Sequence, residues 1–152
     1  ANEGWQPSQV ESFAAALADL GVSMVEQPLH SDADAVLADI AHPLPFCADE
    51  SCHTREGLEQ LVGRYDLVNV KLDKTGGLTE ALALCERARE LGFGVMVGCM
   101  MGTSLGMAPG VLIAQGAEYV DLDGPLWMAK DRVPPLAYAG SVVSPANPDL
   151  WG

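Results

Sequence analysis

Five polar side chains stand at the ends of short apolar runs in this sequence. Glu26 ends SMVE, Asp49 ends FCAD, Lys71 ends LVNVK, Cys99 ends GVMVGC and Asp123 ends YVDLD. These runs recur roughly every 25 residues, about the length that a β-strand and a crossover helix need. In folds that alternate parallel strands with helices, the carboxyl ends of the strands carry the functional groups. The spacing therefore predicts that the five side chains converge on one site.

Glu26 and Asp49 end neighbouring strands of this pattern, so their carboxylates are expected within a few ångströms of each other. Two like charges so placed are costly unless a cation lies between them. Carboxylate oxygens suit Mg²⁺ or Mn²⁺, whereas zinc prefers histidine and thiolate ligands. The pair therefore predicts a site for a hard divalent cation. The alternative is that each acid only caps a nearby loop, as aspartate often does.

Lys71 has the same strand parity as Asn69 and Asp73, which predicts that all three side chains point to one side. A partly desolvated lysine near a cation has a lowered pKa and can act as a base at neutral pH. The alternative is a structural ion pair with Asp49 or Asp73. Two residues apart on the last strand, Asp121 and Asp123 share a face in the same way and could bind an ammonium group.

Composition excludes several classes of function. The chain has 152 residues, and its 21 acidic and 8 basic residues give a formal charge of −13, which disfavours binding to nucleic acid or to anionic membranes. No apolar run reaches the roughly 18 to 20 residues of a membrane span, and the N-terminus lacks signal-peptide features, so we expect a cytoplasmic protein. The four cysteines lack paired metal-binding spacings and are expected to be buried free thiols.

The elements that must position these groups alternate along the chain. Helices are predicted from Pro7 to Leu20 with an apolar face of Phe13, Ala16, Leu17 and Leu20, and then over residues 32–41, 54–64, 79–91 and after Leu105 to about Gln115. Strands are predicted at residues 22–26, 45–49, 67–71, 95–99 and 119–123, with a short hairpin within 136–143. The fold class is α/β, with parallel strands and intervening helices.

Five segments of the sequence resemble the motifs of one known family. The five segments are VEQP, ADESCHTREGLEQL, VNVKLDKTGG, GCMMGTS and DLDGP. Their order and spacing are those found in the enolase superfamily, in its muconate-lactonising branch. DLDGP is most similar to the dipeptide epimerases of that branch. The resemblance implies that the chain is the C-terminal portion, about strands 4 to 8, of a TIM-type (β/α)7β barrel. Residues 1–133 would form the partial barrel, and residues 134–152 a tail that packs on an N-terminal capping domain.

The resemblance also implies roles for individual residues. Glu26 and Asp49 would be Mg²⁺ ligands, Lys71 one of two acid/base lysines, and Asp121 with Asp123 the site for the substrate's α-ammonium. Substrate-pocket residues would include Cys99 and Met101, at the end of the seventh strand of the barrel. The implied reaction is epimerisation of a dipeptide, L-Ala-D/L-Glu being expected, through proton abstraction next to the carboxylate; this superfamily is a known case of lysine bases with Mg²⁺. Such an isomerase would serve the recycling of murein peptides.

The chain departs from the family pattern at its start. Ala1-Asn2-Glu3-Gly4-Trp5 follows the position where the family carries its first metal-binding aspartate, and a second lysine is also lacking. Five of eight strands cannot close a barrel, for which roughly 250 residues are usual. We therefore expect this chain to be part of a longer enzyme and to be inactive alone. The sequence leaves oligomeric state open, a homo-oligomer included.

Other functions remain open from the sequence. Within the same branch, cycloisomerisation or o-succinylbenzoate synthesis would use substrates without an ammonium, which the Asp121 and Asp123 pair disfavours. A nucleotide-binding α/β domain could use Thr75-Gly76-Gly77 as an anion-binding loop, but no glycine-rich phosphate motif supports this. A non-catalytic scaffold would not need a lysine and four acids at strand ends.

Overall fold

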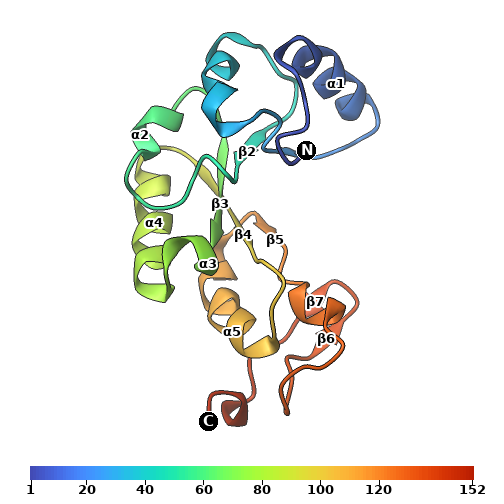
Figure 1. Ribbon diagram of the computed structural model, residues 1–152, viewed down its shortest axis with the longest axis vertical. Coiled ribbons are helices and arrows are strands. Elements are labelled where there is room, and N and C mark those ends of the chain that lie inside the picture. The colour runs from blue at the N-terminus through green and yellow to red at the C-terminus, as the bar shows by residue number, and fades with distance from the viewer.

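Parallel strands form a single curled sheet at the centre of the computed structural model, which describes residues 1–152 (Figure 1). The strands follow one another in chain order, and each pairs in parallel with the next. They are β1 (Val25–Glu26), β2 (Phe46–Ala48), β3 (Leu67–Lys71), β4 (Gly94–Gly98) and β5 (Tyr119–Val120). The sheet is thus an open half-barrel whose strands all end at the same edge, as the sequence spacing predicts.

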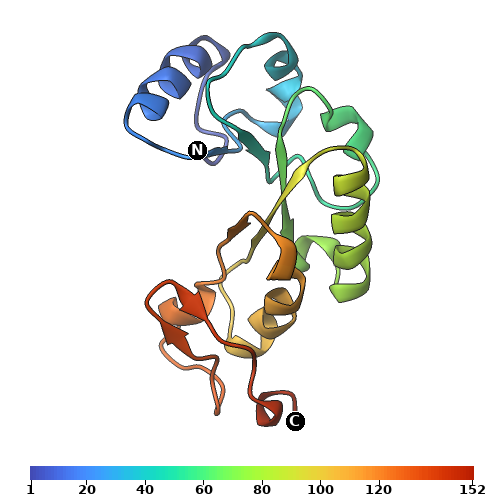
Figure 2. The ribbon, with the colours of Figure 1, turned by 180° about the vertical axis from the view of Figure 1, so that it is seen from behind.

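Helices follow the strands along the chain. They are α1 (Pro7–Asp19), α2 (Leu58–Leu61), α3 (Leu72–Thr75), α4 (Leu78–Glu90) and α5 (Ser104–Ile113). In both views α4 and α5 lie on one side of the strands, the N-terminus lies beside α1 in the upper half, and the C-terminus lies at the lower end of the long axis (Figure 1 and Figure 2). Single 3₁₀ segments cover Ser31–Asp39, Ala114–Gly116, Gly124–Trp127 and Pro148–Leu150. None of the helices is both long and apolar enough to cross a membrane.

The two faces of the sheet are chemically different because side chains alternate along each strand. On the face covered by helices, Phe46, Val68 and Val95 belong to a core of 28 buried residues. On the opposite, inner face, a small cluster of Cys47, Leu67 and Met96 lies near the amino ends of the strands. Polar groups occupy the inner face only toward the carboxyl ends, so the half-barrel has an apolar floor and a polar mouth.

Two predicted helices differ from the structure. The helix expected at 54–64 is the single turn α2, because Gly57 and Gly63 on either side adopt φ of 88° and 80°, outside helical geometry. The helix expected at 32–41 is instead the 3₁₀ segment Ser31–Asp39. The long helix predicted at 79–91 is confirmed as α4, and Gly92 follows it with φ of 88°.

The predicted apolar face of α1 is only partly correct, because Leu17 packs against the main core but Phe13, Ala16 and Leu20 are exposed. Val10 and Ala14 are the buried residues of this helix, whereas Phe13 is 40% exposed and Leu20 is 79% exposed. Phe13 instead meets Trp5 edge to face, with ring centroids 5.3 Å apart. Burial on this helix therefore does not follow the size of the apolar side chain.

The final segment folds back on this chain. A two-stranded antiparallel hairpin, β6 (Tyr138–Ala139) and β7 (Val142–Val143), is present where a hairpin was expected. Leu136 and Leu150 are buried in the main core. The tail is therefore anchored on the half-barrel itself, and its packing on a capping domain stays a prediction. All four cysteines are free, and three of them are buried.

Candidate active site

The carboxyl ends of β1, β2 and β3 bring three predicted site residues together. Glu26 is paired in register with Cys47, and Asp49 lies two residues further along the chain. Lys71 ends β3, opposite Gly98 of β4. Glu26 and Lys71 are half-buried and Asp49 is 5% exposed. The sequence interpretation placed these groups at one mouth of the sheet, and the strand register shows why they meet there.

Asp49 is held by two lysines. Lys71 Nζ lies 2.5 Å from Asp49 Oδ2, and Lys74 Nζ lies 2.5 Å from Asp49 Oδ1. Lys74 also donates to the main-chain oxygen of Asp49 at 2.6 Å and to that of Asn69 at 3.1 Å. Both lysine side chains are nearly buried, so these pairs lie in a region with little solvent screening.

Sequence reasoning missed Lys74. It lies in α3, beyond the strand, and the parity argument applied to strand residues only. The available signal was its spacing from Lys71, because three residues along a first helical turn return a side chain to the side of the strand end. The prediction for Asp73 was wrong for the same reason. Asp73 lies in the helix α3, so its side chain does not follow the strand alternation that it was expected to share with Lys71. Its carboxylate accepts a 3.4 Å hydrogen bond from the Met100 main-chain N–H.

Asn69 holds the second carboxylate. Its Nδ2 donates to Glu26 Oε1 at 2.5 Å, while its Oδ1 is buried without a hydrogen-bond partner. Gly98 on the neighbouring strand makes this possible, because a Cβ at that position would lie 2.6 Å from Asn69 Oδ1. The inward position beside Asn69 therefore has room for a glycine only.

The carboxylates differ in electrostatic environment. Burial raises the pKa of Glu26, and the nearby Asp49 carboxylate adds to the rise against the lowering effect of Asn69. Burial also raises the pKa of Asp49, but hydrogen bonds from Lys71 and Lys74 outweigh it, so that pKa lies below its ordinary value. Two close carboxylates are thus stabilised unequally, and Glu26 lacks the countercharge that Asp49 has.

The pKa of Lys71 is raised rather than lowered as expected. Burial lowers it, but the hydrogen bond and the charge of Asp49, with the charge of Glu26, outweigh burial. The structure shows instead the alternative that the sequence left open, an ion pair of Lys71 with Asp49, whose negative charge favours the protonated lysine. Within this chain, Lys71 is therefore a protonated lysine in an ion pair with the carboxylate of Asp49.

The donor set fits part of a divalent-cation site. Glu26 and Asp49 offer carboxylate oxygens, and neighbouring Glu50 has a buried Oε2 without a partner. Oxygen ligands of this kind are those that Mg²⁺ prefers. No three His, Cys, Asp or Glu residues of this chain lie together as a metal-binding group. These residues therefore suit Mg²⁺, but further ligands must come from water, substrate or other protein.

Asp121 and Asp123 lie together beyond the last strand of the sheet. β5 ends at Val120, so the two acids stand in the following loop rather than on the strand as predicted. Both line a cavity of about 220 Å³ beside the β6–β7 hairpin. Asp123 Oδ2 accepts a 2.8 Å hydrogen bond from Trp127 Nε1. Burial, and then the charge of Asp123, raise the pKa of Asp121. A cationic ligand group would relieve this repulsion.

Cys99 and Met101 follow β4 and border the same end of the sheet. Cys99 is half-buried, and burial raises the pKa of its thiol. Gly124 lies against this loop, because an added Cβ there would be 2.8 Å from the Met100 carbonyl oxygen and 3.3 Å from Cys99 Sγ. Met101 is 69% exposed. The loop after β4 and the turn after Asp123 therefore contact each other directly.

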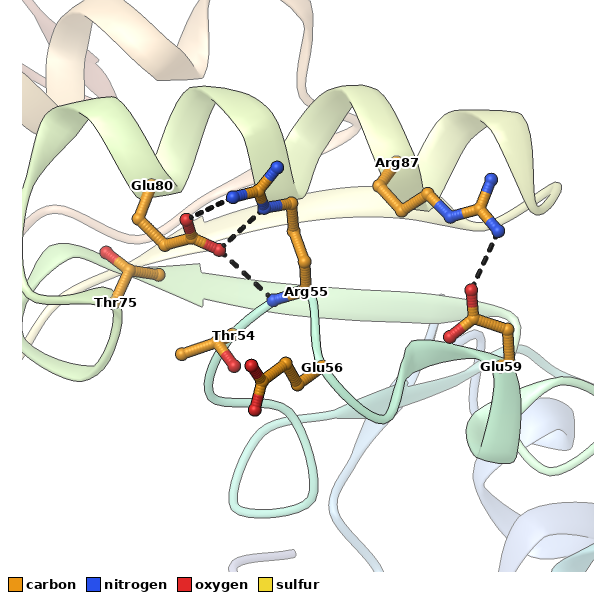
Figure 3. A pocket seen from close by; sticks show the side chains of 7 residues that line it. All are labelled: Thr54, Arg55, Glu56, Glu59, Thr75, Glu80 and Arg87. Atoms are coloured by element: carbon orange, nitrogen blue, oxygen red, sulfur yellow. Dashed lines mark hydrogen bonds and ion pairs between the residues drawn. The ribbon is translucent and has the colours of Figure 1, made fainter.

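The largest hollow of the molecule lies elsewhere. It has a volume of about 690 Å³ and is formed between α4 and the segment before α2 (Figure 3). Its two arginines are already paired: Arg55 with Glu80 at 2.9 Å, and Arg87 with Glu59 at 2.7 Å. Thr75, from the predicted anion-binding loop, also borders it but donates to the Leu72 and Gly77 main-chain oxygens. No free cationic group faces this hollow, which argues against a phosphate site.

The fold and these residues agree with one family. Residues 1–139 match the enolase C-terminal domain-like family. The chain belongs to that family. The half-barrel is accordingly the C-terminal part of an enolase-superfamily TIM-type barrel, as the resemblance in the sequence implied. Its relatives are epimerases and racemases, which are isomerases.

Two curated relatives have closely similar sequences. The chain is 51% identical over 152 residues to N-acetyl-D-glutamate racemase of Pseudoalteromonas sp, covering 100% of this chain and 48% of that protein. It is 52% identical over 138 residues to L-Ala-D/L-Glu epimerase of Escherichia coli (strain K12), covering 91% of this chain and 43% of that protein. The chain thus spans about half the length of the curated relatives it matches.

Two solved structures have folds similar to that of this chain. An enolase family member from Agrobacterium tumefaciens with homology to dipeptide epimerases, bound to sodium and L-Ala-L-Glu, is 58% identical with a TM-score of 0.97; the match covers 100% of this chain and 47% of that one. The dipeptide epimerase of Cytophaga hutchinsonii, complexed with Mg and D-Ala-L-Val, is 29% identical with a TM-score of 0.80, covering 86% and 38%.

Proposed function

We propose that this chain is the C-terminal half of the barrel of a Mg²⁺-dependent dipeptide epimerase that acts on L-Ala-D/L-Glu. The observation that carries the choice of substrate is the pair Asp121 and Asp123. The two acids share one cavity, and neither forms an ion pair within the chain. A dipeptide presents an α-ammonium that would neutralise them, whereas an acylated amino acid does not.

Glu26 and Asp49 would hold the Mg²⁺, and Asn69 would keep Glu26 oriented. Bound Mg²⁺ supplies positive charge that stabilises the negative charge developing on the substrate carboxylate as the α-proton leaves. Lys71 Nζ, which pairs with Asp49 in this structure, would exchange a proton with the α-carbon of the substrate once that carboxylate served as a metal ligand. Lys74 would remain on Asp49 and hold it in place.

Inversion of the α-carbon needs a second proton-transfer group on the opposite face of the substrate. We place that group, the remaining metal ligand and the capping domain in the part of the enzyme that this chain does not contain. Cys99 and Met101 would line the substrate pocket, and the tail from residue 134 would contact the capping domain. Because Ala-Glu units occur in murein peptides, we propose a cytoplasmic role in their recycling.

A second candidate is racemisation of an N-acylated amino acid. The observation that favours it is the 51% identity to an N-acetyl-D-glutamate racemase over the whole chain. The proton-transfer chemistry would be the same, because both substrates carry an α-proton next to a carboxylate. Only the group on the α-nitrogen differs, and Asp121 and Asp123 are the residues that would sense it.

The test uses the full-length enzyme in D₂O with L-Ala-L-Glu, N-acetyl-glutamate and an o-succinylbenzoate precursor as parallel substrates. Deuterium at the α-carbon reports proton transfer directly, and we expect it with the dipeptide. Changing both Asp121 and Asp123 to Asn should lower kcat/KM for the dipeptide by about 100-fold or more, since each charged hydrogen bond contributes about 1.5–3 kcal/mol. Faster exchange of N-acetyl-glutamate, unaffected by these changes, would replace our proposal with the second candidate.

A further inference from the structure

We infer that Gln27 is a positioning residue that fixes Asp49 relative to Glu26; this rests on the proposed function, in which those two acids hold Mg²⁺. Gln27 directly follows Glu26 in the sequence and is completely buried. It has φ of 35°, a region that non-glycine residues adopt only when their surroundings impose it. Its main-chain N–H donates to the Cys47 oxygen of β2 at 2.9 Å, so the chain after β1 remains tied to β2.

The side-chain amide of Gln27 bridges the ends of two strands. Its Oε1 accepts the main-chain N–H of Asp49 at 2.8 Å and that of Ser51 at 3.2 Å. Its Nε2 lies 2.9 Å from the Leu29 oxygen. Main-chain N–H groups only donate and a carbonyl oxygen only accepts, so these contacts fix which end of the amide points to Asp49. Gln27 therefore holds the backbone of one proposed ligand while its own backbone continues from the other.

A buried acid sets the direction of the remaining hydrogen bonds. Asp34, 2% exposed, accepts the hydroxyl of Ser51 at 2.6 Å and that of Tyr65 at 2.9 Å, and its other oxygen accepts from Arg64 at 3.1 Å. Both hydroxyls donate their single hydrogen to Asp34, so each can only accept from Gln27 Nε2, which lies 2.8 Å from both. The amide has two hydrogens, which these two hydroxyls and the Leu29 oxygen share as acceptors. This arrangement requires a donor at Nε2, which excludes glutamate at position 27.

The network thus sets the separation of the two carboxylates before any ion binds. Partners in a second layer around a metal site orient its ligands, and their loss typically weakens metal binding by 10–100-fold. Gln27, Asp34 and Tyr65 are buried and already hydrogen-bonded, so none of them needs to move when the cation arrives. The directions of these hydrogen bonds require a glutamine at position 27. A residue that only filled space would not need both a donor and an acceptor there.

The experiment measures Mg²⁺ binding by calorimetry on the metal-free full-length enzyme. Gln27→Met keeps the volume and removes every side-chain hydrogen bond, whereas Gln27→Glu keeps the acceptor but not the donor. Glu118→Met is the matched control, because Glu118 accepts the Val95 N–H at 2.6 Å at the opposite, amino-terminal end of the sheet. We expect the Kd for Mg²⁺ to rise about 10–100-fold in both Gln27 variants and less than about threefold in the control.

A merely structural role would give a different result. If Gln27 only stabilised the fold, its substitution would lower the number of binding-competent molecules and leave the Kd of the folded fraction unchanged. That result would overturn the inference. If Gln27→Met does not fold, Tyr65→Phe and Ser51→Ala each remove one hydroxyl, and their Kd should rise about 3–10-fold; an unchanged Kd in both also overturns it. Absence of Mg²⁺ binding by the unmodified enzyme would instead refute the proposed function, and the inference with it.

Discussion

At the β1–β3 end of the sheet each proposed metal-binding carboxylate meets a donor, whereas beyond β5 two carboxylates share one cavity without a cation. Asp49 is held by Lys71 and Lys74, and Glu26 by Asn69. Asp123 accepts a hydrogen bond from Trp127, neither Asp121 nor Asp123 forms an ion pair, and burial together with the charge of Asp123 raises the pKa of Asp121 against the lowering effect of Lys71. The first region is assembled in advance, while the second is incomplete until a cationic group arrives.

The difference indicates how the two regions divide the reaction. A proton-transfer centre must hold its groups within a fraction of an ångström, which explains the dense hydrogen bonding around Asp49. A substrate-recognition region can instead hold unfavourable charge that only the correct ligand relieves, because the relief then contributes to selectivity. Substitutions should therefore separate metal binding and chemistry from substrate binding, according to the region that they affect.

Lys71 should give the largest effect. Lys71→Met removes the proposed proton carrier, and Lys71→Arg keeps the positive charge beside Asp49 but introduces a group that does not deprotonate near neutral pH. We expect α-deuterium exchange by the full-length enzyme to fall by about 100- to 10,000-fold in both variants, the usual loss for a general acid/base. Lys130→Met, at an exposed position, is the control. Exchange by Lys71→Arg within tenfold of the unmodified enzyme would contradict the assigned role.

Gly98 should affect the metal-binding region specifically. In Gly98→Ala the new methyl group meets the Asn69 amide, displaces it and thereby releases Glu26. We expect Mg²⁺ affinity to fall about 10–100-fold, as for loss of other groups that orient metal ligands. Titration of the full-length enzyme with Mg²⁺ by calorimetry measures this. An unchanged affinity would show that Asn69 does not orient Glu26.

Gly124 should affect the second region instead. In Gly124→Ala the added methyl group meets the Met100 carbonyl oxygen and forces apart the loop after β4 and the turn that carries Asp123. We expect KM for the dipeptide to rise about tenfold, because a shift of one hydrogen-bonding group costs about 1 kcal/mol or slightly more. Mg²⁺ affinity should stay the same. A loss of Mg²⁺ affinity equal to that of Gly98→Ala would mean that the two regions are not separable.

Much of this arrangement could be predicted from the sequence because it depends on periodicity. The spacing of apolar runs located the five parallel strands, and the rule that functional groups follow strand ends placed Glu26, Asp49 and Lys71 at one mouth. The pair of acids predicted a hard divalent cation, whereas the reaction class came from resemblance to a family, since strand ends alone fit several chemistries. Assignment of roles to these residues stays a prediction for the experiments above.

The groups that support the site could not be found in that way. Lys74 is on a helix, where the two-residue strand rule does not apply, and its contact with Asp49 depends on how α3 turns after β3. Gln27 is neutral, so a search for ionisable residues passes over it. The buried face of α1 was also missed, because the prediction followed the largest apolar side chains, whereas the buried residues are Val10 and Ala14.

The smallest expected effect is on stability, and it concerns Asp121. Its pKa in the folded protein lies above the ordinary value, so the folded state binds the proton more tightly than the unfolded state does. The free energy of unfolding therefore decreases as the pH rises from the ordinary pKa of aspartate through the raised pKa of Asp121, and the decrease is complete at neutral pH. Asp121→Asn should remove this decrease and stabilise the substrate-free full-length enzyme at pH 7.5 by on the order of 0.5 kcal/mol.

Thermal unfolding of the two proteins between pH 7.5 and pH 4.5 measures this difference. The advantage of Asp121→Asn should shrink as the pH falls toward the ordinary aspartate pKa of about 3.9, because the folded wild-type protein regains the proton there. Glu86→Gln, on the exposed face of α4, is the control for loss of one negative charge. An Asp121→Asn enzyme that is less stable at pH 7.5 would show that this carboxylate is already balanced, and the contrast between the two regions would then be lost.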